Sequence, residues 1–322
     1  MRPSRVIGFF EGKAHGPLLV CLGGIHGNEV SGIKAIETVL SLLEREAEIN
    51  PGFVFRGSVL GLRGNLQAIH AGNRYQEKDL NRIWTTAHIQ RIKAAPMDAL
   101  QAEDLELREL IEIIEHNLAI KKPERLYLLD LHTTSAGGGI FTVATDNPES
   151  IRIGVALHAP VIIGLLAGLE GTTLHYFTDE NTGIPTTGVS FESGQHDDPL
   201  SVNRAIAALI NCLQIVGCIP DGTVENRYDE ILHRYSEGLP KVAELITSHR
   251  VRPGDQFQMR PGYANFQPIR QGEVLAHDAR GPITAIADGL ILMPLYQSQG
   301  SDGFFIVRAV EEGERVGRAN AS

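Results

Sequence analysis

The chain has 322 residues, with 29 lysines and arginines against 39 aspartates and glutamates, which gives a net charge of −10 at pH 7. Hydrophobic residues make up 43% of it, enough to bury a full core, so a largely disordered protein is excluded. The acidic balance and the lack of a basic cluster argue against nucleic acid or an anionic membrane as a partner. This length predicts one large domain or two unequal ones.

Three further features concern the compartment. The longest uncharged apolar run, residues 159–169, is too short to cross a bilayer, which takes about 20 residues. The N-terminal segment has no sustained apolar stretch of the kind found in signal peptides. The three cysteines are an odd number and lie in apolar surroundings, as expected for reduced, buried thiols. The sequence therefore predicts a cytoplasmic protein.

The first third of the chain alternates strand and helix patterns. Residues 18–22 form a continuous apolar run that ends in two glycines, which is typical of a buried parallel strand. Residues 29–48 then carry apolar side chains at helical spacing, and residues 58–64 resemble a second strand. Residues 103–118 have the apolar stripe of an amphipathic helix.

The same alternation continues to about residue 217. Residues 126–131 read as another buried strand, followed directly by His132. Shorter apolar runs cover residues 137–145 and 161–166, and a strand-like stretch at 188–191 precedes Glu192. Residues 199–217 have helical spacing. Strands alternating with helices predict an α/β fold with a mostly parallel or mixed sheet.

The pattern changes after about Pro220. Residues 224–248 are expected to include a connecting helix, and residues 250–310 consist of short strand-like pieces separated by glycine and proline turns. We therefore predict two domains. Residues 1–220 would form a catalytic α/β domain, and residues 221–322 a linker helix with a smaller all-β domain.

Metal-binding side chains follow two of the predicted strands. His26 and Glu29 lie three residues apart where a strand gives way to a helix, so that one helical turn would place them on the same side. His132 follows a different strand, and ligands gather beyond the carboxyl ends of strands in open α/β sheets. Two histidines and one glutamate, with a position left for water, form the ligand set of a hydrolytic zinc site. Alternatively, His26 is a loop histidine and Glu29 an exposed glutamate favoured by the helix dipole.

Three residues in the polar stretch from Arg74 to Arg82 are candidates for substrate contacts. Arg74 could polarise a carbonyl group, and Arg82 with Asn81 could hold a carboxylate. The alternative is a solvated arginine that pairs locally with Glu77 or Asp79.

Two carboxylates complete the set of candidates. Glu192 follows apolar Phe191 at a third strand end, where a raised pKa would suit a general base; the alternative is an ordinary loop glutamate. Asp130 stands two residues before His132, on the same side of a strand, and could orient that imidazole.

Four motifs in this order, GGIHGNE, RYQEKDLNR, DLHTT and VSFESG, resemble the succinylglutamate desuccinylase/aspartoacylase family. The resemblance covers most of residues 1–220. It implies the zinc carboxypeptidase-like fold, a mixed sheet flanked by helices, with a small β-rich C-terminal domain. It also implies one zinc per chain on His26, Glu29 and His132, oxyanion stabilisation by Arg74, carboxylate binding by Asn81 and Arg82, and catalysis by Glu192.

The activity implied is zinc-dependent hydrolysis of the amide bond in an N-acyl amino acid or a similar small amide, with the metal-bound water activated by Glu192. The alternatives are a carboxypeptidase-like enzyme acting on a peptide or peptidoglycan fragment, and a non-catalytic metal-dependent protein that binds a carboxylate. The partner would be a small molecule, and a homo-oligomer is compatible with the sequence.

The sequence departs from the family pattern at one place. Aspartoacylase-like members carry an arginine shortly before the catalytic glutamate, where it binds the carboxylate of the acyl group. Residues 178–190 contain neither lysine nor arginine. We therefore expect an acyl group other than that of N-acetylaspartate or N-succinylglutamate.

Overall fold

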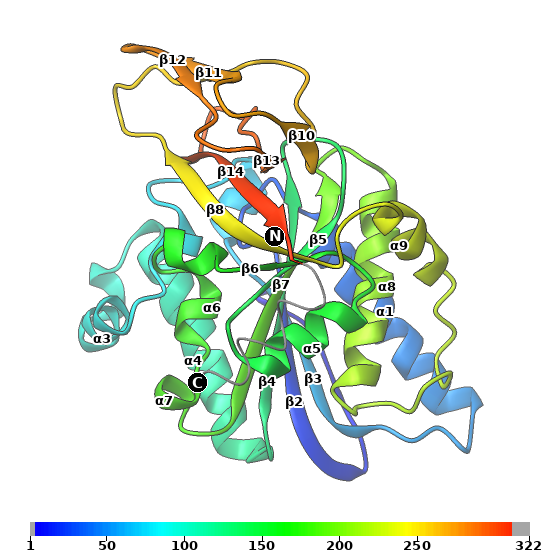
Figure 1. Cartoon of the computed structure of the whole chain (residues 1–322). Coiled ribbons are helices and arrows are strands. Elements are labelled where there is room, and N and C mark those ends of the chain that lie inside the picture. The colour runs from blue at the N-terminus through cyan, green and yellow to red at the C-terminus, as the bar shows by residue number, and fades with distance from the viewer. Residues whose placement is uncertain (1–3, 311–322) are drawn as a thin grey trace.

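An eleven-stranded mixed sheet runs through the computed structural model, which describes residues 4–310 (Figure 1). Its strands lie in the order β1 (Val6–Glu11), β3 (Arg56–Arg63), β2 (Ala14–Gly23), β4 (Leu126–Thr134), β7 (Thr186–Gln195), β5 (Phe141–Ala144), β6 (Val161–Ile163), β8 (Val242–Arg250), β14 (Asp302–Ala309), β13 (Gly289–Leu292) and β10 (Gln267–Ile269). The four neighbours β3, β2, β4 and β7 are mutually parallel. The α/β fold with a mixed sheet is confirmed.

Helices cover both faces of the parallel strands. One face packs against α1 (Ser31–Ile49), α5 (Pro148–Ala156), α8 (Leu200–Ile215) and α9 (Asp229–Ser236), and the other against α3 (Thr86–Ala94), α4 (Ala102–Lys121) and α6 (Thr173–Tyr176). The remaining helices are α2 (Leu66–Ala71), α7 (Asp179–Thr182) and the short 3-10 turns Leu80–Arg82, Met97–Ala99 and Leu165–Gly168.

Strand β2 shows why this sheet needs helices on both sides. Leu19 and Cys21 pack into the core under α1 and α8, whereas Leu18, Val20 and Leu22 pack into the core on the α4 side. Successive side chains of a strand point to opposite faces, so a run without polar residues must be buried on both. The continuous apolar run in the sequence follows from this arrangement.

The C-terminal part is rich in β-strands, as expected. Strands β8, β14, β13 and β10 extend the large sheet, because β8 pairs in parallel with β6. A second sheet of three strands contains β12 (Gly281–Thr284), β11 (Val274–Asp278) and β9 (Gln258–Met259), and it lies at one end of the molecule (Figure 1). The division into two domains at residue 220 stays a prediction.

The connecting helix expected within residues 224–248 is confirmed as Asp229–Ser236, and the same range also contains the start of the strand Val242–Arg250. The apolar run at 161–166 is a three-residue strand followed by a 3-10 turn.

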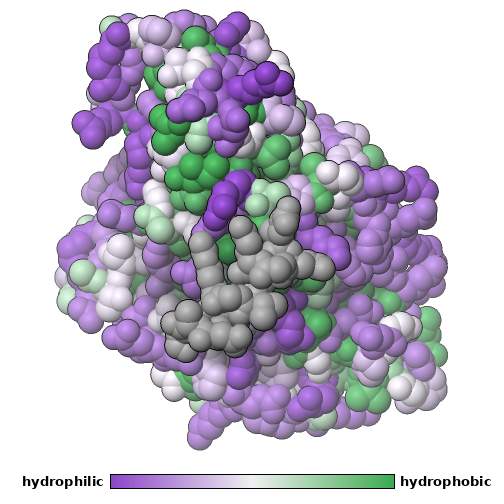
Figure 2. Space-filling view, viewed as in Figure 1, coloured by the Kyte–Doolittle hydropathy of each residue, from purple (hydrophilic) through white to green (hydrophobic). Residues whose placement is uncertain are grey.

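The surface and the cysteines complete the description. Cys21, Cys212 and Cys218 are free and buried, as predicted. Hydrophilic residues dominate the face drawn in Figure 2, with hydrophobic side chains gathered on the C-terminal strands. Among residues 4–310, no helix combines the length and the apolar character that a membrane span requires.

Candidate metal centre

The three predicted metal ligands converge in the structure. Nδ1 of His26 lies 2.8 Å from Oε1 of Glu29, and Nδ1 of His132 lies 2.9 Å from Oε2 of the same carboxylate. Each residue offers one possible ligand atom, and these three atoms all lie within 4.8 Å of one another. The three residues are 2–5% exposed, so the group is buried.

The loop between β2 and α1 positions His26 and Glu29. Helix α1 begins only at Ser31, and a tight turn before it brings the two side chains together, with Glu29 N donating to His26 O at 3.0 Å. This replaces the helical turn expected from the sequence. Gly24 has a φ of +73°, which glycine adopts without strain, and a Cβ on Gly27 would stand 2.1 Å from the backbone of Ala68.

Each histidine contacts an aspartate carboxylate through Nε2, the ring nitrogen that does not face Glu29. Nε2 of His26 lies 3.0 Å from Oδ1 of Asp79, and Nε2 of His132 lies 3.0 Å from Oδ2 of Asp130. Asp130 in turn accepts a hydrogen bond of 2.7 Å from Thr173 Oγ1. Carboxylates in this position fix the ring orientation of metal-binding histidines. Both rings therefore present Nδ1 to the Glu29 side.

Sequence reasoning assigned the orienting position beside His132 to Asp130 but missed Asp79. Asp79 was considered only as a local ion-pair partner of an arginine. Its contact with His26 spans 53 residues, and no spacing rule connects two loop residues that far apart.

The protonation of this group follows from its burial and its charges. Burial alone lowers the pKa of His132, but the Asp130 and Glu29 carboxylates outweigh that effect and hold the pKa well above its usual value. Burial raises the pKa of Glu29, but the two histidines have the larger combined effect and hold the pKa well below its ordinary range. The charges within the group thus favour the protonated form of His132 and the ionised form of Glu29.

Glu192 lies next to the three ligands, within strand β7. It is the register partner of His132 in the parallel β4–β7 pair. The strand continues to Gln195, so Glu192 does not end it, contrary to the expectation. Its Oε2 atom is buried and has no hydrogen-bond partner among residues 4–310. Burial, only partly offset by His132, raises the pKa of Glu192 to about 7.

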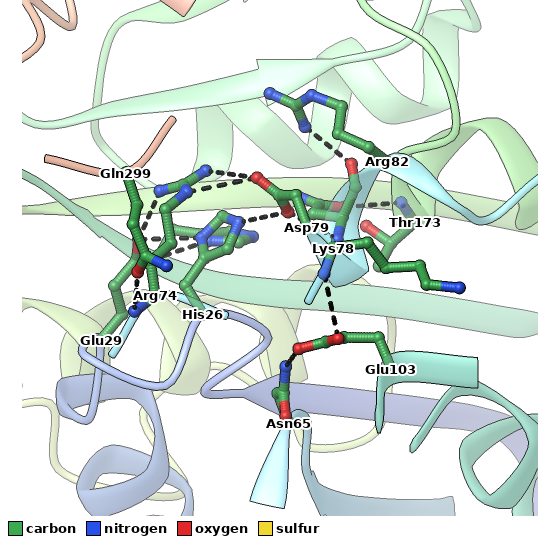
Figure 3. Close-up of polar contacts among 12 residues, drawn as sticks. His26, Glu29, Asn65, Arg74, Lys78, Asp79, Arg82, Glu103, Thr173 and Gln299 are labelled. Atoms are coloured by element: carbon green, nitrogen blue, oxygen red, sulfur yellow. Dashed lines mark hydrogen bonds and ion pairs between the residues drawn. The ribbon is translucent and has the colours of Figure 1, made fainter. Parts of the chain in front are cut away.

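Arg74 reaches the same group from the loop after α2, and Figure 3 shows it beside His26 and Asp79. Its Nη1 lies 3.3 Å from Glu29 Oε1, and its Nη2 donates to Asp79 Oδ2 at 3.1 Å. The side chain is 13% exposed, so the predicted alternative of a solvated arginine is wrong, although the pairing with Asp79 does occur. Burial lowers the pKa of Arg74, but Asp79 and Glu29 outweigh it and raise the pKa.

A buried glutamate holds the loop that carries Arg74 and Asp79. Oε1 of Glu103 accepts from Asn65 Nδ2 at 2.9 Å (Figure 3). The same oxygen accepts from Gln76 N at 2.7 Å. Its Oε2 accepts from the next two backbone amides at 3.1 and 3.2 Å. Four donors on one fully buried carboxylate fix the path of residues 76–78. We call this set of four hydrogen bonds the Glu103 clamp. The sequence did not predict it.

Asn81 and Arg82 are both engaged with the rest of the chain. Asn81 Oδ1 accepts a hydrogen bond of 3.0 Å from Thr173 N. Arg82 Nη1 donates to Asn81 O at 2.7 Å, and its Nη2 donates to Asp302 at the start of β14. Asp302 lies 220 positions after Arg82 in the sequence and was not predicted.

These residues line one cavity of about 110 Å³. Its walls contain the three metal-ligand candidates, Arg74, Asn81, Arg82 and Glu192. The C-terminal part contributes Met293, Leu295, Gln297, Gly300, Asp302 and Phe305. Segments on both sides of residue 220 therefore build the same pocket.

Comparison with known proteins shows which family this chain resembles. The model of the succinylglutamate desuccinylase/aspartoacylase catalytic domain matches residues 15–214. A succinylglutamate desuccinylase from Pseudomonas aeruginosa (strain UCBPP-PA14) is 32% identical over 278 residues, which cover 84% of this chain and 76% of the relative.

Two further matches differ in extent. A succinylglutamate desuccinylase from Pseudomonas fluorescens (strain SBW25) is 33% identical over 130 residues, 40% of this chain, and the match spans only 35% of that relative's length. The crystal structure of a succinylglutamate desuccinylase/aspartoacylase from Rhodobacter sphaeroides superimposes with a TM-score of 0.62 at 17% identity, covering 94% of this chain and 88% of that one. At that identity the likeness shows the fold.

Proposed function

The chain belongs to the succinylglutamate desuccinylase/aspartoacylase family, and from this premise we propose that it hydrolyses the amide bond of an N-acyl amino acid or a similar small amide with zinc as its cofactor. The names of its relatives describe the removal of an acyl group from an amino acid. One observation carries the proposal. A buried carboxylate without a hydrogen-bond partner, Glu192 Oε2, stands beside the His26–Glu29–His132 group.

The donor set fits zinc. Two imidazole nitrogens and one carboxylate converge, and each imidazole has its other nitrogen held by an aspartate, as in protein zinc sites. His26, Glu29 and His132 would hold one ion per chain. When bound, zinc supplies Lewis-acid chemistry that polarises a carbonyl group and makes water more acidic. The same donors also accept Co²⁺ or Mn²⁺.

Glu192 is assigned the proton transfers. Its carboxylate takes a proton from the attacking water and then delivers that proton to the leaving amine nitrogen. A pKa of about 7 suits both steps, because the group can accept and release a proton near neutral pH. Glu192 Oε2 has no hydrogen-bond partner among residues 4–310, whereas a purely structural buried glutamate would be saturated with donors.

We assign the stabilisation of the oxyanion to Arg74. Its guanidinium is fixed by Asp79 and Glu29, so it needs no reorganisation when negative charge develops on the carbonyl oxygen. One such donor is worth about 3–4 kcal/mol of transition-state stabilisation. Asn81 and Arg82 are assigned to substrate binding. We place the enzyme in the cytoplasm, with which its free, buried cysteines agree.

The carboxypeptidase-like and non-catalytic alternatives are distinguished by experiment. Purified protein is supplied with zinc and screened against N-acyl amino acids, N-acyl amino acid amides and short peptides, and release of a primary amine is measured. Release from the acyl compounds alone supports the deacylase. Release from peptides alone favours the carboxypeptidase-like enzyme, and none across the panel, with ligand binding retained, favours the binding protein.

A further inference from the structure

Both arginines of the pocket are already paired with the chain's own carboxylates. Arg74 contacts Asp79 and Glu29, and Arg82 donates to Asp302. Among the described residues that line the cavity there is no other arginine and no lysine. Apart from a cation bound by the metal ligands, the pocket therefore offers no uncompensated positive charge to an anionic substrate.

The pair between Arg82 and Asp302 is well enclosed. The Arg82 side chain is 18% exposed and the Asp302 side chain 12%, and both line the cavity. Asp302 also forms an ion pair with Arg250, whose Nε lies 3.9 Å from Oδ1, but Arg250 does not line the cavity. A substrate carboxylate that approached Arg82 would meet the negative charge of Asp302 at the same place. Like charges in a partly buried site repel strongly, because the low local dielectric weakens screening.

The pair also leaves two polar atoms without hydrogen bonds. Arg82 Nε and Asp302 Oδ1 are buried and have no hydrogen-bond partner among residues 4–310. One is a donor and the other an acceptor. A carboxamide group carries both an acceptor oxygen and N–H donors, whereas a carboxylate carries acceptors only. An uncharged amide can therefore pair with both kinds of atom, whereas a carboxylate can pair only with the donor.

The rest of the cavity wall, apart from the metal ligands, the charged side chains and Asn81, contains more apolar than polar side chains. Eight of its side chains are aliphatic or aromatic, among them Leu165, Leu166, Leu169, Leu174 and Phe305. Leu165–Gly168 forms the 3-10 turn beside β8, and Gly168 O accepts from Arg250 at 3.4 Å. The apolar wall and the Arg82–Asp302 pair thus lie in one region of the pocket. A hydrocarbon group of the substrate would gain from burial there, and a second charged group would not.

We propose that the substrates are N-acyl compounds with an aliphatic group and no free carboxylate beside the scissile amide, such as an N-acyl amino acid amide, and that Asp302 sets this preference by occupying Arg82. The proposal rests on the deacylase function above and narrows its substrate class. Replacing Asp302 by asparagine removes the competing charge and frees Arg82 for a substrate carboxylate.

The test compares N-acetyl-L-leucinamide with N-acetyl-L-leucine on the zinc-loaded protein. Release of leucinamide or leucine is followed by chromatography, and kcat/KM is measured for each. We expect the wild-type protein to favour the amide at least tenfold, and Asp302→Asn to shift this ratio at least tenfold toward the carboxylate. Asp278→Asn is the matched control, because Asp278 pairs with Arg280 in the small sheet and does not line the cavity.

Binding to the zinc-loaded Glu192→Gln protein, measured by calorimetry, gives a readout without turnover. Tighter binding of the amide supports the proposal even if neither compound is hydrolysed by the wild type, in which case the deacylase function fails alone. Equal or better use of N-acetyl-L-leucine by the wild type overturns the proposal and leaves the deacylase function standing. The wild-type ratio decides this outcome even if Asp302→Asn does not fold.

Discussion

Glu192 and His132 are direct register partners in the parallel β4–β7 pair, so a buried carboxylate stands beside a metal-ligand candidate at a position fixed by the sheet itself. Register partners in a parallel pair point to the same face. The backbone hydrogen bonds of two central strands thus set the relation between base and ligand, and no mobile loop is involved. A rigid element of this kind suits a site that needs fixed distances.

Removal of one ligand should remove the metal. We expect the wild-type protein to contain about one zinc per chain and His26→Ala to lose it, because two remaining donors bind zinc weakly. Elemental analysis after dialysis against a mild chelator measures this content.

A second histidine group provides the control for that experiment. His158, Asp229 and His233 also lie close enough together to hold an ion, but on a more exposed surface. His233→Ala should keep the zinc content at one per chain. If His233→Ala loses the metal and His26→Ala retains it, the assignment of the metal centre is wrong.

Zinc affinity should rise with pH through the neutral range. Asp130 and Glu29 hold the pKa of His132 well above its usual value, so the ring is protonated at neutral pH before metal binds. A metal must displace that proton, so binding releases it and strengthens as pH increases. Competition with a zinc indicator at pH 6, 7 and 8 measures the trend, and a flat or falling affinity would argue against His132 as a ligand.

The Glu103 clamp should matter for both stability and metal binding. Replacing Glu103 by glutamine places an NH₂ group against backbone donors, which should lower the free energy of unfolding by about 2–3 kcal/mol. The shifted loop would also move Asp79 away from His26, and loss of such a contact costs about 10–100-fold in metal affinity.

Glu112→Gln is the matched variant for the clamp, since Glu112 lies on the same helix and pairs with Arg108 at the surface. It should change the free energy of unfolding by less than about 0.5 kcal/mol. Urea unfolding and zinc titration of both variants test the clamp. Equal stability of the two proteins would exclude it.

Local patterns in the sequence account for the parts of the fold that were predicted. The apolar runs before Gly23 and His132 mark strands buried on both faces, and ligands placed after two such strands meet at one sheet edge. Strand β7 was cut short because Glu192 interrupts its apolar run, although a functional carboxylate can sit inside a strand. The segment around Val242 has apolar residues at spacings that fit a helix as well as a strand.

Long-range contacts could not be read from spacing. Asp302 reaches Arg82 only because β14 joins the large sheet beside β8, a pairing that depends on the whole topology. Asp79 behind His26 is a similar case, since both residues lie in loops whose paths are set by distant elements such as Glu103. The ligand types were thus predictable, whereas the carboxylates that orient them or compensate nearby arginines were mostly not.

Activity of the zinc-loaded Glu192→Gln protein on N-acyl compounds is the most direct test of the proposed deacylase chemistry. Glutamine keeps the size of the side chain but cannot take a proton, so we expect full zinc content and a fall in kcat of about 10²–10⁴-fold. Amine release and zinc content are measured on the same sample, with the wild type alongside. A variant that retains zinc and releases amine at the wild-type rate would contradict the role of Glu192 as the general base.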